Sequence, residues 1–182
     1  MKMKKFLKIT IALGLAISFK GCLLFHSVSY EITADVNGGG SAVLTIEDIR
    51  SDAIDSKELN EDKKSLFEFM YRSDEFINQM NGEGKRIKSR ELLVDESKLN
   101  GRLKFDFDDI ETVEGIIYEE PFYYLTLSAE DSIISTNGEV IRSDKHKRIM
   151  WDNSIEVLKF TMYSDAVKGQ NLIGMAQYFE SE

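Results

Sequence analysis

The chain has few of the residues on which many stabilising and catalytic sites depend. Its 182 residues include one cysteine, one proline, one tryptophan and two histidines. One cysteine cannot form an internal disulfide, and one cysteine with two histidines cannot supply a four-ligand Cys/His zinc site. A folded domain must therefore be stabilised by its hydrophobic core, which a chain with 42% apolar residues can form.

The common catalytic and nucleotide-binding motifs are also missing. The sequence contains no Gly-x-Ser-x-Gly nucleophile turn and no His-Glu-x-x-His zinc helix. The glycines at 38–40 and 82–84 lack the spacing and the helix start of a phosphate-binding loop, and are typical of turns. His146 lies between lysines and Arg148, a cationic setting that disfavours a charged imidazole and a bound metal cation. We therefore predict a protein that is not an enzyme, with no catalytic residues, metal site or cofactor.

The long apolar run of the chain lies at its start. Lys2, Lys4 and Lys5 precede the apolar stretch from Phe6 to Phe19, and Gly21-Cys22 follows it. This order of basic, apolar and small residues is typical of a secretory signal peptide. No later stretch approaches the ~20 apolar residues that a membrane-spanning helix needs.

The Gly21-Cys22 end resembles the lipobox of bacterial lipoproteins. The resemblance implies that the signal peptide, residues 1–21, is removed and that the Cys22 sulfur receives a diacylglyceryl group. The new amino terminus is then acylated as well, for example with palmitate. The protein would be exported and anchored through Cys22 to a membrane of the cell envelope. Leu23, in place of Asp after the cysteine, implies the outer membrane where the organism has one.

The charge of the exported part excludes one class of partner. The first 21 residues carry five lysines and no acid, so the remaining 161 carry 18 basic and 32 acidic residues, a formal charge of −14. Such a charge repels the phosphates of nucleic acids, and we expect no nucleic-acid partner. It also disfavours electrostatic adhesion to anionic lipid, so membrane contact is expected to depend on Cys22.

The segment after the cysteine is short and apolar. Residues 22–27 are predicted to be a tether, which reaches at most ~20 Å when extended. The single domain predicted over residues 28–182 should therefore lie close to the bilayer, with Leu23, Leu24 and Phe25 in its interfacial layer.

Hydrophobic periodicity predicts the elements of this domain. Alternation around the turn residues 37–40 predicts a β-hairpin over residues 28–49. Helical spacing over residues 56–81, with Ser73-Asp74-Glu75 as a second cap, predicts two helices with a bend at residue 73. Further strands are predicted over residues 86–94, 103–107, 122–127, 149–151 and 155–163.

Turns and short helices complete the prediction. A turn is expected at residues 98–101, a short helix after Asp109, and a hairpin over residues 133–142 built on Asn137-Gly138. The apolar residues between 172 and 179 predict one more short helix. This element order favours an α+β fold, an antiparallel β-sheet with helices packed on one face, in one domain.

Aromatic and basic side chains are the candidates for ligand or partner contact. The strand aromatics could line a pocket for an apolar ligand or form plain core. Tyr123 and Tyr124 are adjacent, so one of them must point away from the core. The basic groups at 85–90 and 142–148 could meet lipid phosphates or an acidic partner, or pair locally with surface acids. The contact candidates are Tyr123, Tyr124, Trp151, Lys145, Lys147 and Arg148.

Carboxylates are numerous, and one group comes nearest to a calcium cluster. Asp106, Asp108 and Asp109 are close in sequence, but Thr112 and Val113 follow where an EF-hand needs glycine and further ligands. The alternative is that Asp106 and Asp108 form the wet face of a strand and Asp109 caps a helix. Hydrolysis by a pair of carboxylates is a further candidate function, although no motif identifies such a pair.

The predicted first hairpin carries a second resemblance. Its residues 35–41, Asp-Val-Asn-Gly-Gly-Gly-Ser, follow the leader closely, as in small bacterial lipoproteins of unassigned role. The order is also similar to the LppM-type lipoprotein domain, in which a strand ending Asp-x-(Asp/Asn)-Gly-x-Gly precedes helices and more sheet. This resemblance implies an α+β fold and binding of a lipid or another apolar ligand.

Two functions follow from the sequence. The first is a lipid-anchored envelope protein that is not an enzyme and binds a protein partner or scaffolds a complex. The alternative is a carrier or sensor of a lipid or another apolar ligand close to the membrane.

Overall fold

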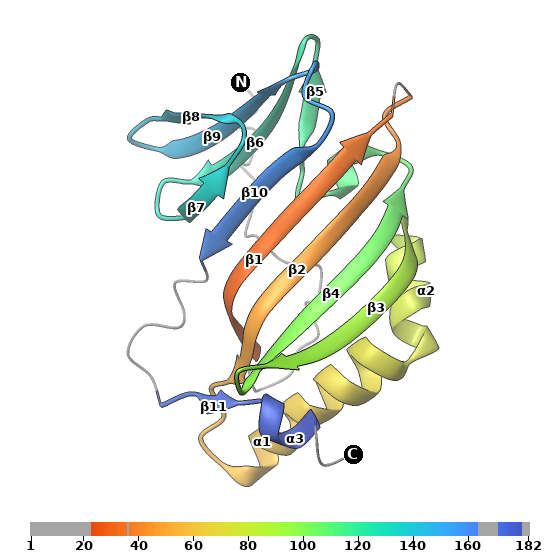
Figure 1. The fold of residues 1–182 in the computed structure, drawn as a ribbon, viewed down its shortest axis with the longest axis vertical. Helices are drawn as coiled ribbons and strands as arrows, with labels where there is room; N and C mark the ends of the chain where they lie inside the picture. Colours follow the sequence, from red (N-terminus) through yellow and green to blue (C-terminus); the bar gives the residue numbers. More distant parts are fainter. Residues whose placement is uncertain (1–22, 36, 164–170, 180–182) are drawn as a thin grey trace, which may run out of the picture.

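Antiparallel β-sheet makes up most of the protein, with few helices (Figure 1). The computed structural model describes residues 23–35, 37–163 and 171–179. The predicted signal peptide and Cys22 lie outside these residues. The prediction of an α+β fold with antiparallel sheet therefore holds in its coarser sense, since strands and helices are both present but strands dominate.

The strands form two sheets. The large, seven-stranded sheet has the order β3–β4–β2–β1–β10–β7, with β11 paired to β2, and the small, four-stranded sheet has the order β5–β6–β9–β8. The strands of the large sheet are β1 (Leu23–Ala34), β2 (Gly40–Ser51), β3 (Lys85–Asp95), β4 (Lys98–Phe107), β7 (Ser132–Thr136), β10 (Leu158–Tyr163) and β11 (Ile173–Gly174). Those of the small sheet are β5 (Ile117–Glu119), β6 (Phe122–Ser128), β8 (Glu139–Arg142) and β9 (His146–Asp152).

One helical segment links the first hairpin to β3. It consists of α1 (Ser56–Lys63), the π-helical η1 (Lys64–Arg72) and α2 (Asp74–Gly82). The Asp55 side chain caps α1, and the Ser73 hydroxyl accepts the Glu75 N–H at the start of α2. The predicted bend at residue 73 is confirmed. Two short helices, η2 (Ile110–Thr112) and α3 (Ala176–Phe179), complete the structure, so the helix predicted from residue 172 is limited to four residues.

The prediction of a tether is wrong from Leu23 onward, because residues 23–27 belong to a strand. Strand β1 begins at Leu23, which pairs with Ser51, and Phe25 pairs with Ile49. Leu23 and Phe25 pack against a buried cluster that includes Ile49 and Leu66. An apolar residue every second position suits a strand face as well as a membrane tether, and pairing with β2 satisfies its backbone groups. Leu23 and Phe25 therefore belong to the packed domain and do not form a free tether.

The turn between β3 and β4 also differs from the prediction. It lies at Glu96 and Ser97, both with positive φ, and Lys98 to Gly101 belong to β4. Two consecutive left-handed residues match the twist of a tight hairpin, which is usually formed by Asn or Gly. Without either residue at these positions, the sequence signal pointed to Asn100-Gly101 instead.

The predicted hairpin at Asn137-Gly138 is a crossover between the two sheets. Strand β7 pairs with β10 in the large sheet, whereas β8 pairs with β9 in the small one. The Asn137 side chain accepts hydrogen bonds from Trp151 Nε1 (2.9 Å) and the Lys159 N–H (2.8 Å), which bind it to both sheets. A Cβ at Gly138 would lie 2.7 Å from Trp151 Nε1, so the glycine is needed for close approach here.

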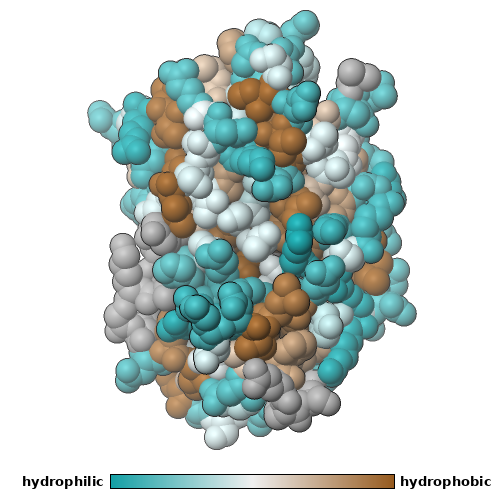
Figure 2. All heavy atoms as spheres, viewed as in Figure 1, coloured by the Kyte–Doolittle hydropathy of each residue, from teal (hydrophilic) through white to brown (hydrophobic). Residues whose placement is uncertain are grey.

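The hydrophobic core has two clusters. The first joins the sheets, and its fully buried residues include Ile32 and Phe160 of the large sheet and Ile149 and Trp151 of the small one. The second joins η1 to the large sheet through Leu66, Phe67, Ile49 and Leu99. The face of the large sheet turned to the viewer in Figure 2 carries mostly hydrophilic and intermediate side chains with scattered hydrophobic ones.

A left-handed residue shifts the side-chain alternation of β2. Leu44, Ile46 and Ile49 line one pocket and so share a face, although Ile46 and Ile49 are an odd number of residues apart. Asp48 lies between them with φ of 54°, and this departure from strand geometry accounts for the shift. The buried Asp48 is held by its N–H donating to Asn100 Oδ1 (2.9 Å) and by Arg50 Nη2 (2.6 Å).

The position of β1 yields a test with two insertions. A flexible ten-residue Gly/Ser insert between Cys22 and Leu23 should change the free energy of unfolding by less than ~0.5 kcal/mol, as surface changes usually do. The same insert after Phe25 separates Leu23 and Phe25 from the rest of β1. It should lower the free energy of unfolding by ~2 kcal/mol or more, because the burial of these two apolar side chains is lost. Urea unfolding measures both. Equal stability of the two variants would contradict the strand assignment.

Candidate functional site

A pocket lies where the two core clusters meet. Its walls come from β1 to β4, from η1 and α2, and from the turn at Val113-Glu114. Leu44 and Phe105 belong to the cluster between the sheets, whereas Ile49 and Leu66 belong to the cluster beneath η1. The pocket is thus a gap at the junction of two packed regions.

Most of the pocket wall is apolar. The η1 and α2 side contributes long, flexible or aromatic side chains, among them Met70, Phe76 and Met80, and the sheet side contributes Phe25 and Leu103. Methionine fills irregular space and adapts to differently shaped apolar ligands. Gly101 forms part of the wall without a side chain, which leaves the space above β4 open.

The cavity volume of about 110 Å³ limits what the pocket can hold. Sites that enclose a whole drug-sized molecule have ~300–1,000 Å³, whereas an apolar cavity of ~150 Å³ holds one benzene ring. The pocket therefore has room for one slender apolar group, such as part of a single acyl chain. The rest of such a ligand would extend through the open side.

A hydrogen-bonded pair interrupts the apolar wall. The Tyr30 hydroxyl donates to Glu114 Oε1, and Tyr30 stacks on Phe160 with ring centroids 5.0 Å apart. Glu114 and Gly115 have positive φ (55° and 71°), so the chain reverses sharply here and brings the carboxylate to the pocket. Val113 and Ile116 on either side are buried and anchor this turn in the core.

Burial changes the protonation of this pair. The pKa of the Glu114 carboxyl is raised because burial disfavours its charged form, while the hydrogen bond from Tyr30 and the charge of Lys85 act in the opposite direction. The pKa of the Tyr30 hydroxyl is raised well above its ordinary value, first by burial and then by the charge and hydrogen bond of Glu114. Tyr30 is therefore a hydrogen-bond donor at any physiological pH.

Lys85 extends the polar part of the wall toward the surface. Its Nζ lies 3.4 Å from Glu83 Oε2, and the Lys85 side chain is only 16% exposed, against 32% for Glu83. Both residues line the pocket together with Tyr30 and Glu114. Glu83, Lys85, Glu114 and Tyr30, which we call the polar stripe, thus run from the partly exposed rim to the buried interior.

Arg90 holds together the part of the wall formed by β3 and the helical segment. Its Nη1 donates to the carbonyl oxygens of Met70 (3.0 Å) and Ser73 (2.8 Å), where η1 ends and α2 begins. These carbonyls lie at the end of a helix, where such oxygens lack a helical partner. Arg90, predicted within a basic cluster, therefore ties the helical segment to β3.

The aromatic contact candidates lie away from the pocket. Trp151 is fully buried between the sheets and donates to Asn137, so our prediction that it contacts a ligand or partner is wrong. Tyr123 packs against the same core, whereas Tyr124 lies beneath the Arg148 guanidinium, 5.3 Å from its ring centroid. Tyr124 is thus the tyrosine that points away from the core.

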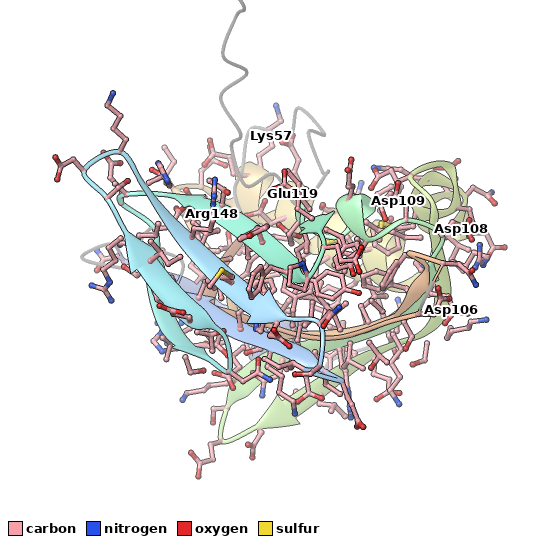
Figure 3. The ribbon with its side chains drawn as sticks, turned by 90° about the horizontal axis from the view of Figure 1, so that it is seen from above. Lys57, Asp106, Asp108, Asp109, Glu119 and Arg148 are labelled. Atoms are coloured by element: carbon pink, nitrogen blue, oxygen red, sulfur yellow. The ribbon has the colours of Figure 1, made fainter. Side chains whose placement is uncertain are left out.

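The basic contact candidates do not form one group. Lys147 Nζ donates to the Asp131 carbonyl (2.5 Å), Arg148 Nε donates to Thr126 Oγ1 (3.3 Å), and Lys145 is exposed. Figure 3 shows Arg148 on the side of the molecule opposite Asp106 and Asp108.

Two residues of the basic group at 85–90 pair with candidate calcium ligands. Lys88 of β3 lies 2.7 Å from Asp106 of β4, and Arg86 lies 2.5 Å from Asp108, the residue after β4. Asp109 accepts the Glu111 N–H at the start of η2. These contacts agree with the alternative interpretation of the three acids, in which they face solvent or cap a helix and do not bind calcium. In the described part of the chain, no three His, Cys, Asp or Glu side chains are grouped to hold a metal ion.

Sequence reasoning missed the pocket residues. Met70 and Met80 belong to the apolar side of the predicted helices. The local sequence does not distinguish a methionine that lines a pocket from one that fills the core. Glu114 offered a signal, since it is a lone acid between Val113 and Ile116 in an apolar stretch. Tyr30 gave none, because an aromatic residue on a strand face usually belongs to the core.

Comparisons with known proteins add no assignment. A scan against protein-family models, a search of the curated proteins and a search of the solved structures each found no match. Among residues 23–35, 37–163 and 171–179, no helix is long and apolar enough to cross a membrane.

The raised pKa of Glu114 predicts a pH dependence of stability. The folded state holds this proton more tightly than the unfolded chain, so the stabilising contribution is complete below the ordinary carboxyl pKa. It is lost as the pH rises through the raised pKa. Glu114→Gln keeps a carbonyl for the Tyr30 hydroxyl and should remove this loss, so wild type should become less stable relative to the variant as the pH rises above the ordinary carboxyl pKa of about 4.3.

Urea unfolding at several pH values measures this difference. Glu111→Gln removes an exposed carboxylate three residues away and serves as the matched control, which should follow the wild type. Parallel curves for wild type and Glu114→Gln would show that Glu114 titrates alike in both states.

Proposed function

We propose that the protein is a lipid-anchored lipoprotein of the bacterial cell envelope that binds one acyl chain of a membrane amphiphile. The proposal keeps the lipobox prediction for Cys22 and the location in the outer membrane where one exists. No catalytic step is assigned to it. The function would be that of a carrier or sensor of lipid rather than of an enzyme.

The apolar pocket is the observation that carries this proposal. The proposal assumes that the helical segment covers one face of the large sheet. The pocket then has Met70 and Met80 on its helical side and Leu103 on its sheet side. A soluble domain gains by filling an apolar space of this kind, because bound hydrocarbon leaves water and contacts side chains that otherwise lack partners. An acyl chain fits the narrow volume better than a bulky ring system does.

The position of the anchor supports a ligand taken from the bilayer. Cys22 directly precedes Leu23, the first residue of β1, and Phe25 of the same strand lines the pocket. Three strand residues span ~10 Å, which is shorter than the hydrocarbon thickness of a bilayer, ~30 Å. An acylated Cys22 would therefore keep the pocket close to the lipid from which it draws its ligand.

Binding of a protein partner, or scaffolding of an envelope complex, is the second candidate. Large apolar side chains are 41–54% exposed on all four outermost strands, Leu93 on β3, Ile134 on β7, Ile117 and Tyr118 on β5, and Ile141 on β8. Sheet edges with exposed apolar residues are sites where another chain can add a strand. A crosslinked partner at these strands would favour this function.

Filling the pocket tests the first candidate. A Cβ at Gly101 would make ordinary contacts, with Ile49 Cδ1 at 3.5 Å and Leu92 Cδ2 at 3.7 Å, so a side chain is tolerated there. Gly101→Leu should occupy the pocket and weaken binding of 1,6-diphenyl-1,3,5-hexatriene, a neutral, rod-shaped apolar fluorophore only one ring wide, by about tenfold or more. Gly101→Ala is the matched control and should bind within about threefold of wild type.

Fluorescence titration measures these affinities, and circular dichroism checks that each variant is folded. Overpacking costs ~1–3 kcal/mol, which a domain of ordinary stability tolerates. If wild type, Gly101→Ala and Gly101→Leu bind the fluorophore equally, the pocket is not the binding site.

A further inference from the structure

We propose that the polar stripe selects an amphiphile whose head group donates hydrogen bonds, an ammonium or a hydroxyl, and rejects a free carboxylate. This inference rests on the proposed function and names the ligand class of the same pocket. It follows from the arrangement of Glu83, Lys85, Glu114 and Tyr30 along one wall.

The acceptor capacity of the stripe exceeds its donor capacity. Two carboxylates of the stripe face one ammonium, and the Tyr30 hydroxyl already donates to Glu114. Two arginines also line the pocket: Arg90 donates to two backbone carbonyls, and the exposed Arg102 is the cross-strand neighbour of the exposed Glu91. A carboxylate has two oxygens with about four acceptor positions, so Glu114 retains positions for further donors. A ligand ammonium or hydroxyl can fill these positions, whereas a ligand carboxylate offers only more acceptors.

The lysine does not reverse this preference. Lys85 is paired with Glu83 at 3.4 Å and also lies within electrostatic range of Glu114, whose pKa its charge lowers. Its positive charge is therefore shared between two acids before any ligand arrives. A ligand carboxylate would have to compete with both of them in a poorly solvated site, and like charges at such distances repel strongly.

The apolar surroundings make the selection effective. Tyr30 is 4% exposed, and the neighbouring wall consists of Phe105, Val113 and Leu103. A head group that enters this region loses water and must recover hydrogen bonds from the stripe. An ammonium or hydroxyl recovers them from Glu114, while a carboxylate does not. The chain of the ligand then lies along the methionines of η1 and α2.

Displacement of 1,6-diphenyl-1,3,5-hexatriene from the full chain carrying Cys22→Ser tests the selection. The competitors are dodecylamine, 1-dodecanol and dodecanoate, which share a chain length and differ in head group. Dodecylamine should displace the fluorophore at a concentration about tenfold lower than dodecanoate, with 1-dodecanol between them. In Glu114→Gln, dodecylamine should lose about tenfold in affinity and the order should collapse.

The control variant is Glu111→Gln, which removes one negative charge from an exposed position on the same turn and should keep the wild-type order. It separates recognition at Glu114 from general attraction of a cation to an acidic protein. The inference is overturned if dodecanoate binds as well as dodecylamine, or if Glu114→Gln keeps the wild-type order. Failure of the proposed function would give a different result, because the fluorophore would then bind the Gly101→Leu variant as tightly as it binds wild type.

Discussion

The left-handed conformation of Asp48 is the constraint on which the arrangement of the large sheet depends. A strand of constant alternation presents every second residue to one face, so Ile46 and Ile49 would face opposite sides. Because Asp48 adopts a φ of 54°, both residues reach the same face. Such a conformation costs about 1–3 kcal/mol in a residue other than glycine, and the hydrogen bonds with Asn100 and Arg50 offset it.

This shift explains why one strand serves two packed regions. On one side of Asp48, Ala42 and Leu44 pack in the core between the two sheets, and on the other, Ile49 packs with Leu66 and Phe67 of η1. The two regions are built on different alternations and meet at Ile46, which is partly buried and packs against both. The pocket occupies the junction between them, and the polar stripe enters it through the turn at Glu114.

Much of the local structure could be predicted, since short-range signals decide it. The first hairpin follows from alternation around 37–40, and the break at Ser73 follows from its capping hydroxyl. Long-range pairing decided the rest. Asn137-Gly138 has the composition of a hairpin turn, but its partners Trp151 and Lys159 belong to different sheets. Leu23 and Phe25 read as a tether because the sequence does not show that β2 extends to Ser51.

The candidate site was less predictable than the fold. Aromatic and basic residues attract attention in a sequence, yet Trp151 is core, and Arg86 and Lys88 pair with neighbouring acids. The pocket depends on residues far apart in the chain, such as Phe25, Met70, Leu103 and Glu114. The hydrophobic periodicity of each element is the same whether or not a pocket lies between it and its neighbours, so the sequence does not reveal the pocket.

Native mass spectrometry of the protein extracted from its own membranes, without added ligand, shows whether the pocket holds a lipid chain. We expect a chain that begins at Cys22 with covalently attached acyl groups and carries one non-covalent, single-chain amphiphile. Collisional activation should release this amphiphile, and a chain with the pocket filled at residue 101 should lack it. An extracted protein without any bound amphiphile, or the same adduct on both chains, would show that the pocket does not bind lipid.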